Sequence, residues 1–170
     1  RYLSCDTLML SVGLLPENEL FKKAGVALSP ITGGPTVDED FQTSVPGIFA
    51  AGNALQVHDL VDYASLEAEK AGHNAALFAD SGKLPEPTVQ VRAGKGIRYV
   101  VPQKLCGSEP VDFSMRVTDP AADRYIVFRR NGQLVRRMKQ SVLAPSSMIR
   151  VRLRADRLEA GAGDLTVEVA

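Results

Sequence analysis

The pattern of apolar and polar residues changes character near the middle of the chain. From residue 89 onward the two kinds of residue alternate, most clearly in residues 111–117, 149–153 and 165–169. Strict alternation is typical of strands that bury one face and expose the other. With short turns between them, six or seven such strands predict a small all-β antiparallel sandwich in this half of the chain.

The strongest turn signal in this half is Asn131-Gly132. The dipeptide lies between two strand-like segments, residues 124–130 and 133–139. Asn-Gly readily adopts the positive φ angles of a two-residue hairpin, so the pattern predicts a hairpin here.

The first half of the chain has a different pattern, with short continuous apolar runs and two helical segments. Residues 6–12 and 48–51 predict strands that are buried on both faces, the second as a central strand of a parallel sheet. Residues 16–24 predict a short helix with Pro16 at its first position. Residues 62–80 predict a long helix, and Asp62 is the expected N-cap.

The long helix and the second strand predict a ligand site between them. Small side chains recur on one face of the helix, at Ala64, Ala68, Ala71, Ala75 and Ala79, so this face can lie close to a sheet. The first turn of the helix offers N–H groups to an electron-rich oxygen. Gly52 follows the strand, at the end where open α/β sheets bind ligands.

Composition and charge divide the chain into two expected domains, residues 1–83 and 84–170. The proline-containing connector 82–87 cannot continue a helix. The first domain has five Lys and Arg against eleven Asp and Glu, a net charge of −6, and the second has fifteen against nine, a net charge of +6. Opposite charges favour docking of the two domains, or of the basic domain on a partner subunit.

Several functional classes are excluded by what the chain lacks. No apolar run reaches the length of a membrane helix, and no secretory signal precedes the first strand. The two cysteines, Cys5 and Cys106, lie far apart and indicate neither a metal site nor a redox pair, which is typical of a cytoplasmic protein. We expect no nucleic-acid binding, because aromatic residues are few and acids lie among the twelve arginines of the second domain. Three of these arginines are expected on the solvent face of one strand: Arg150, Arg152 and Arg154.

Three sequence elements together resemble a known flavoprotein family. The residues Thr43-x6-Ala50-Ala51-Gly52-Asn53 resemble the second flavin-binding motif of two-dinucleotide-fold flavoproteins, a Thr, six residues and then Ala-x-Gly-Asp. Residues 6–18 resemble the strand and Gly-x-x-Pro turn that lead back from the NAD domain to the FAD domain. The helix at 62–80 looks like the one that follows in thioredoxin reductase and its relatives. The chain therefore resembles the C-terminal part of a pyridine nucleotide-disulphide-type oxidoreductase.

The loop at residues 52–62 looks closest to one bacterial subgroup of these flavoproteins. That subgroup includes oxidoreductases associated with anaerobic glycerol 3-phosphate metabolism, and it is related to opine and sarcosine oxidase subunits. For residues 84–170 the resemblance is only to the tail of the same subgroup.

The resemblance implies the fold and the cofactor contacts. Residues 1–83 would be the C-terminal portion of an FAD-binding, Rossmann-like α/β domain, with NAD(P) as a possible second cofactor. Gly52, Asn53 and the backbone near Ser65 and Leu66 would touch the flavin. Asn53 stands where the family has Asp, so a hydrogen-bonding group is kept without the charge.

The sequence supports two alternative functions. The first is a flavoprotein that passes electrons between a reduced small-molecule substrate or NAD(P)H and FAD, with no residue assigned to catalysis. His58 is expected to be a hydrogen-bonding or solvated loop residue that could support the flavin contacts, and catalysis by it is the less favoured alternative. The alternative is a non-catalytic interaction module of a larger complex. The chain contains no Gly-x-Gly-x-x-Gly turn, so we expect it by itself to be inactive and to hold no stoichiometric FAD.

The first residues of the chain lead to a prediction about the packing of residues 1–83. The chain begins with Arg1, not Met, and leads directly into an apolar run, as a cut inside a longer protein would. We therefore expect residues 1–83 to be poorly packed or to be completed by a second copy of the chain.

Overall fold

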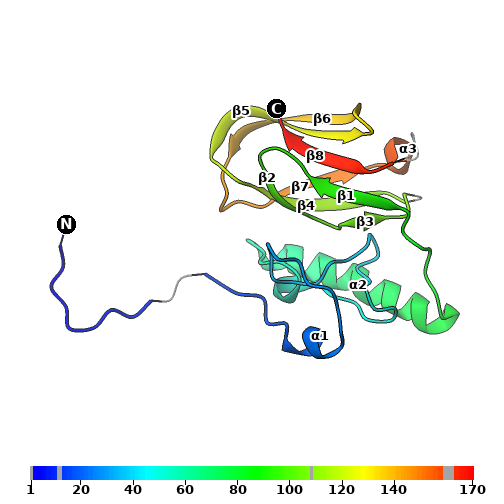
Figure 1. The fold of residues 1–170 in the computed structure, drawn as a ribbon, viewed down its shortest axis with the longest axis horizontal. Helices are drawn as coiled ribbons and strands as arrows, with labels where there is room; N and C mark the ends of the chain where they lie inside the picture. Colours follow the sequence, from blue (N-terminus) through cyan, green and yellow to red (C-terminus); the bar gives the residue numbers. More distant parts are fainter. Residues whose placement is uncertain (1, 11–12, 108, 159–162) are drawn as a thin grey trace.

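The protein consists of a β-rich body with a helix and loops packed beneath it (Figure 1). The computed structural model describes residues 2–10, 13–107, 109–158 and 163–170. Strands make up more of the described chain than helices do, so the fold is mixed α/β with mostly sheet content.

The second half of the chain forms two sheets. The described strands are β1 (Val89–Ala93), β2 (Ile97–Val101), β3 (Lys104–Leu105), β4 (Val111–Val117), β5 (Ala121–Arg130), β6 (Gln133–Leu143), β7 (Ile149–Leu153) and β8 (Leu165–Val169). One sheet has the order β3-β1-β8-β5-β6, and the other has the order β2-β4-β7. All the strand pairs are antiparallel except β1 and β8, which are parallel. The expectation of a wholly antiparallel unit is wrong at this pair, because β1 and β8 are far apart in the chain and no tight turn dictates their relative direction.

The alternating residues face one apolar core between the two sheets. Phe113 and Met115 of β4 are fully buried, as is Phe128 of β5. The rings of Phe113 and Phe128 lie 5.4 Å apart between centroids, and this contact joins the three-stranded sheet to the five-stranded one. A short helix that the sequence pattern did not predict, α3 (Ala155–Leu158), adds the buried Leu158 to the same core.

The hairpin predicted at Asn131-Gly132 is confirmed. Both residues have positive φ angles, 46° and 79°, and the flanking Arg130 and Gln133 pair directly across β5 and β6. Positive φ at both turn residues matches the right-handed twist of the strands.

The first half of the chain contains two helices and a short 3-10 turn. The long helix α2 (Val61–Ser81) confirms the predicted one to within a residue at each end, but Leu60, not Asp62, is the N-cap residue. The first helix, α1 (Glu19–Lys23), begins three residues later than the predicted Pro16 start. The 3-10 turn η1 (Gly52–Ala54) lies between the two helices.

The buried face of α2 is not the predicted stripe of alanines. Ala71 is buried, but Ala68 and Ala79 are exposed, and the buried face also carries the polar residues Glu67 and Asn74. Asn74 donates hydrogen bonds to the backbone oxygen and to Oδ1 of Asp40, both at 3.1 Å. The helix therefore packs on loops that supply polar partners.

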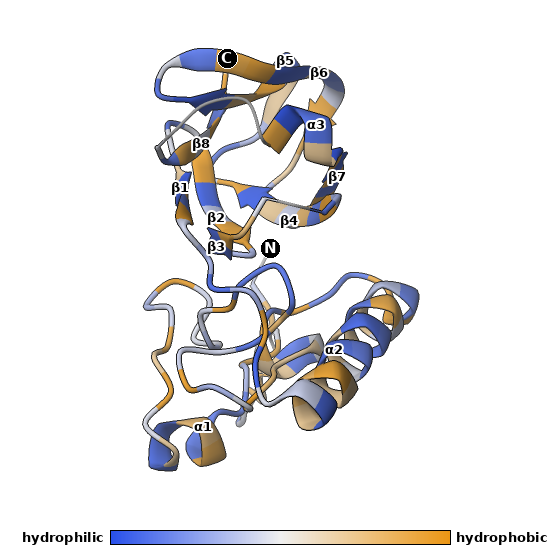
Figure 2. Ribbon diagram, turned by 90° about the vertical axis from the view of Figure 1, so that its right-hand side faces the viewer, coloured by the Kyte–Doolittle hydropathy of each residue, from blue (hydrophilic) through white to orange (hydrophobic). Residues whose placement is uncertain are grey.

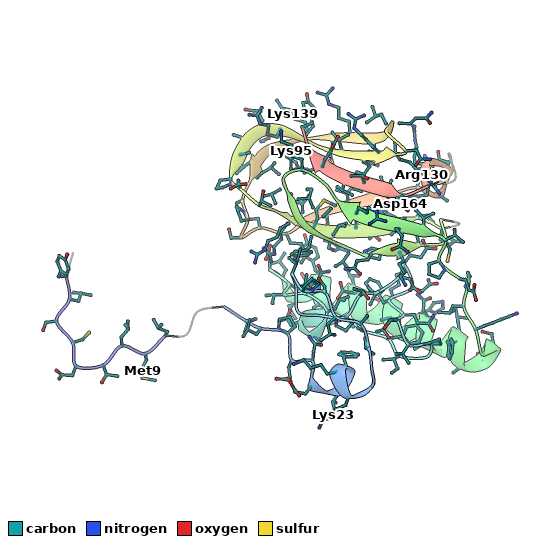
Figure 3. The ribbon with its side chains drawn as sticks, in the orientation of Figure 1. Met9, Lys23, Lys95, Arg130, Lys139 and Asp164 are labelled. Carbon is teal, nitrogen blue, oxygen red and sulfur yellow. The ribbon has the colours of Figure 1, made fainter. Side chains whose placement is uncertain are left out.

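The strand predicted at residues 6–12 is absent from its described part. Residues 6–10 pair with no other described segment, and the side chains of Leu8, Met9 and Leu10 are exposed. Figure 3 shows Met9 on an extended segment that runs away from the rest of the molecule. A strand needs a neighbouring backbone to complete its hydrogen bonds, and no described strand lies beside this segment. Residues 11 and 12 lie outside the described residues.

The central parallel strand predicted at residues 48–51 is also wrong. The chain turns back at Val45-Pro46-Gly47, and Phe49 makes a single antiparallel bridge with Gln42. A hydrogen bond of 3.0 Å runs from the Ala50 N–H to the Phe41 oxygen. This tight return brings residues 41–43 beside the segment, so its backbone pairs locally and not with a distant parallel strand.

A second apolar core lies where the two halves of the chain meet. It contains Leu55 and Phe41 of the first half together with Tyr99 and Val101 of β2. In Figure 2, α2 and the loops of the first half lie below the β-rich body, next to β2 and β3. This core is therefore completed by the second half of the same chain. Residues 1–83 were expected to be poorly packed or to be completed by a second copy, and association between copies stays a prediction. In the described part of the chain, no helix is long and apolar enough to cross a membrane.

We predict that Val101→Ala loosens the first half of the chain more than the β-rich body. Val101 is 2% exposed and packs in the shared core, so its truncation leaves a cavity there and costs on the order of 2 kcal/mol of unfolding free energy. Hydrogen exchange is expected to accelerate in residues 37–56 while β5 and β8 stay protected.

The control is Val142→Ala, because Val142 is 73% exposed. Equal loss of protection in both halves would show that the shared core does not govern the first half separately.

Candidate functional site

The centre of the predicted site is a sharp turn at Gly52. Ala51 is extended, and Gly52 then takes a φ angle of 66° to begin η1. A side chain at this φ is strained, so the position favours glycine. A Cβ built on Gly52 would meet no atom within 4 Å, so the backbone of the turn is open on that side.

The inner side of the turn is held by the buried carboxylate of Glu67, from α2. Its Oε1 accepts a hydrogen bond of 2.7 Å from the Gly52 N–H, and its Oε2 accepts one of 2.9 Å from Gln56 Nε2. His58 Nε2 lies 3.0 Å from Oε1, and the side chains of His58 and Glu67 are only 3% and 6% exposed. These three donors satisfy the buried carboxylate, which would otherwise be costly to desolvate.

Sequence reasoning did not single out Glu67. Its one signal is its place on α2, four residues before the buried Ala71 and close to the Gly52 turn only in the folded chain. His58 was expected to support the flavin contacts; the structure places it against Glu67, and its role toward a flavin stays a prediction.

The side chain of Asn53 is exposed and its orientation is set within the loop. Asn53 Oδ1 accepts a hydrogen bond of 3.0 Å from the backbone N–H of His58. Because a backbone N–H is a donor, the atom that faces it must be the oxygen of the amide. The NH₂ group of Asn53 is therefore directed away from this contact.

The other two predicted site residues lie in the first turns of α2. Ser65 is exposed and its Oγ donates to the Val61 oxygen at 3.1 Å, while Leu66 is 53% exposed. Among the described residues, no side chain caps the N-terminus of α2, so N–H groups of its first turn lack a described side-chain acceptor. The structure thus joins Gly52 to the second turn of α2 through Glu67, and whether the four residues bind flavin stays a prediction.

A cavity of about 750 Å³ lies between α2 and the three-stranded sheet. Its lining includes His58, Leu66 and Glu67 on one side and Ser114 and Arg150 on the other. Arg150 was expected in solvent beside Arg152 and Arg154. The latter two are exposed, but the Arg150 guanidinium is partly buried, 4.4 Å from the centre of the Tyr63 ring.

An acidic cluster, Asp38, Glu39 and Asp40, lies in a loop that contacts α2 through Asn74. Burial raises the pKa of each of these three carboxyl groups. The nearby Cys106 thiol is affected in the same direction: burial, followed by the charges of Glu39 and Asp40, raises its pKa to about 12. The thiol is therefore protonated at neutral pH and is a poor nucleophile. Among the described residues, no three His, Cys, Asp or Glu side chains are arranged to hold a metal ion.

The part of the chain that contains the Gly52 turn matches a known protein family. Residues 1–68 match the model of the pyridine nucleotide-disulphide oxidoreductase family. The match includes the turn, the loop after it and the start of α2, and it confirms the family resemblance of this region. The narrower bacterial subgroup stays a prediction.

One curated protein is similar to part of this chain. The chain is 44% identical over 57 residues to a subunit of alkyl hydroperoxide reductase in Xanthomonas campestris pv. phaseoli. The alignment covers 34% of this chain and 10% of that protein, so the chain spans about a tenth of the length of the relative it matches. No solved structure matches the chain.

We predict that the two cysteines react at very different rates with a thiol reagent such as dithiobis(nitrobenzoic acid). Cys5 is exposed, whereas the Cys106 thiol has a raised pKa and donates to the Pro85 oxygen at 3.3 Å. One thiol per chain should react rapidly at pH 8 and the second only after denaturation. In a Cys5→Ser variant the rapid phase should disappear, and a rapid phase that persists would contradict the assignment.

Proposed function

We propose that this chain forms part of an FAD-dependent oxidoreductase that passes electrons between a reduced substrate or NAD(P)H and FAD. The observation that carries the proposal is the Gly52 turn. Its backbone is open to a ligand, it is bonded to α2 through Glu67, and it falls inside the region that matches the oxidoreductase family.

The residues around the turn could bind the flavin ring of FAD and the polyol chain next to it. Gly52 leaves room for the cofactor to approach the backbone. The first turn of α2, residues 61–64, precedes Ser65 and Leu66 and offers N–H donors to an oxygen. Two buried polar atoms beside the turn, Nδ1 of His58 and Oε1 of Gln56, lack a partner among the described atoms. Unpaired buried polar atoms are uncommon, and because protein covers both of these they are positions for an internal water and not contacts to FAD.

Asn53 would contact the cofactor as a donor. Its Oδ1 is used by the His58 N–H, so its NH₂ group is the part that can reach a hydroxyl oxygen of the polyol chain. An aspartate at this position would instead accept a hydrogen bond from such a hydroxyl. The Asn therefore changes the direction of the hydrogen bond without removing it.

The chemistry of electron transfer is supplied by FAD when it is bound, and this chain would hold and orient it. The Glu67 carboxylate keeps the turn and the His58 ring in place from the inside. We place the protein in the cytoplasm and in the subgroup related to anaerobic glycerol 3-phosphate oxidoreductases. Residues 84–170 would be a separate β-sandwich domain, following the FAD-binding portion in residues 1–83.

The proposal is tested by the flavin content of two polypeptides, this chain and the longest natural polypeptide that contains it. The longer polypeptide should purify with yellow colour and release FAD on denaturation. This chain should hold no stoichiometric FAD, because it lacks the Gly-x-Gly-x-x-Gly turn that normally receives the pyrophosphate. A colourless longer polypeptide that gains no flavin on addition of FAD would overturn the proposal and favour a non-catalytic interaction module.

We predict that Asn53→Ala weakens FAD binding by about 1 kcal/mol, the contribution of one hydrogen bond. The measurement is the dissociation constant of FAD in the longer polypeptide, followed by flavin fluorescence on dilution. Gln90→Ala is the control, because it removes an exposed amide side chain on β1, in the other half of the chain. Equal FAD retention in the wild type and in Asn53→Ala would count against Asn53 as a cofactor contact.

A further inference from the structure

Arg116 connects the β-rich body to the loop that follows the Gly52 turn. It lies in β4 between Met115 and Val117, which are buried in the core, so its own side chain points to the opposite face of the sheet. That side chain is only 12% exposed, because the loop of residues 54–60 covers it.

The guanidinium binds the loop at two residues. Nη2 of Arg116 donates to Oδ1 of Asp59 at 2.5 Å and to the backbone oxygen of Val57 at 3.1 Å. The other oxygen of Asp59 accepts a hydrogen bond of 2.6 Å from the Met148 N–H. Both oxygens of this carboxylate are therefore held by the second half of the chain.

Electrostatics agrees with this geometry. Burial alone raises the pKa of the Asp59 carboxyl, but the Met148 N–H and the Arg116 guanidinium outweigh it and hold the pKa below its ordinary value. Asp59 is therefore ionised at neutral pH, and its contact with Arg116 is a charge-assisted hydrogen bond.

Three residues of the second half of the chain hold the Arg116 guanidinium in place. Its Nε donates to Tyr99 Oη at 3.1 Å, and its Nη1 donates to the backbone oxygens of Pro145 and Ser146. The planar guanidinium presents several donors in fixed directions, so these contacts determine where the loop can lie.

The residue between the two anchored positions is His58, and this is the residue that orients Asn53. With Val57 and Asp59 both bound to Arg116, the peptide of His58 cannot rotate freely. Its N–H points at Asn53 Oδ1, and its ring reaches Glu67. We propose that Arg116 is a positioning residue for the cofactor site, acting through Val57, His58 and Asp59 to set the orientation of Asn53. The cofactor part of this inference rests on the proposed function.

The first experiment uses this chain without cofactor and measures hydrogen exchange at the His58 amide by NMR. Arg116→Gln should accelerate that exchange by about tenfold, the effect of losing one charge-assisted hydrogen bond. The control is Gln103→Ala, which removes another contact between the two halves, the hydrogen bond from the Val37 N–H to Gln103 Oε1, away from the loop. The control should leave the His58 amide unchanged.

The second experiment measures FAD dissociation from the longer polypeptide. Arg116→Gln should accelerate dissociation by no more than about fivefold, the effect of losing the Asn53 hydrogen bond altogether. Arg116→Lys should accelerate it by less, because an ammonium group keeps the contact with Asp59 but cannot bond in all the other directions. The double variant Arg116→Gln/Asn53→Ala should dissociate no faster than the faster of the two single variants. That non-additivity is expected only if Arg116 acts through Asn53.

Each result supports or overturns a specific role of Arg116. An unchanged His58 amide in Arg116→Gln, or an equal change in Gln103→Ala, would overturn the role of Arg116 in holding the loop. A freed amide with unchanged FAD dissociation, or additive effects in the double variant, would overturn positioning while the proposed function stands. A longer polypeptide that binds no FAD would overturn the proposed function and the cofactor role together, with the anchoring of the loop still decided by the amide.

Discussion

The first half of this protein depends on the surface that β2 offers to it. Its own apolar residues, such as Leu55 and Phe41, form a core only because Tyr99 and Val101 complete the far side. Burial of apolar area is the main favourable term in folding, and a unit with one long helix and mostly loops has little of it to bury alone. The packing of the Gly52 turn is therefore coupled to the folding of the β-rich body.

Polar contacts give the same interface its register. An apolar contact holds two surfaces together without selecting one alignment, whereas a hydrogen bond requires a particular distance and direction. At one edge Gln103 and Val37 exchange hydrogen bonds, and at the other Arg116 and Met148 hold Asp59. The loop between these contacts carries Asn53, so a residue of the β-rich body can influence a site that belongs to the other half.

Inside the first half, one buried carboxylate organises the site. Glu67 receives the backbone of Gly52, the amide of Gln56 and the ring of His58. A buried charge is tolerated when donors surround it, and removing those donors is costly. The arrangement keeps the outer side of the turn open while its inner side is fully bonded, which suits a turn that must keep its shape beside a ligand.

Elements whose sequence signals are local could be predicted before the structure was known. The β5–β6 hairpin follows from Asn131-Gly132, the strands of the core from alternation, and α2 from its composition and the glycine that ends it. The motif around Gly52 also pointed to the family that residues 1–68 match. Each of these signals lies within a few residues of the feature it predicts, because turn angles, side-chain alternation and helix ends are set by neighbouring residues.

Contacts between distant parts of the chain could not be predicted in this way and are seen only in the folded protein. The apolar runs at residues 6–12 and 48–51 had the composition of buried strands, but a strand also needs a partner backbone, and composition does not supply one. The parallel pairing of β1 with β8 and the meeting of Arg116 with Asp59 likewise join residues far apart in sequence. Nothing in the local pattern separates Arg116 from the solvent-facing arginines of the same unit. It differs from them because the first half of the chain folds over it and gives its guanidinium a carboxylate to bind.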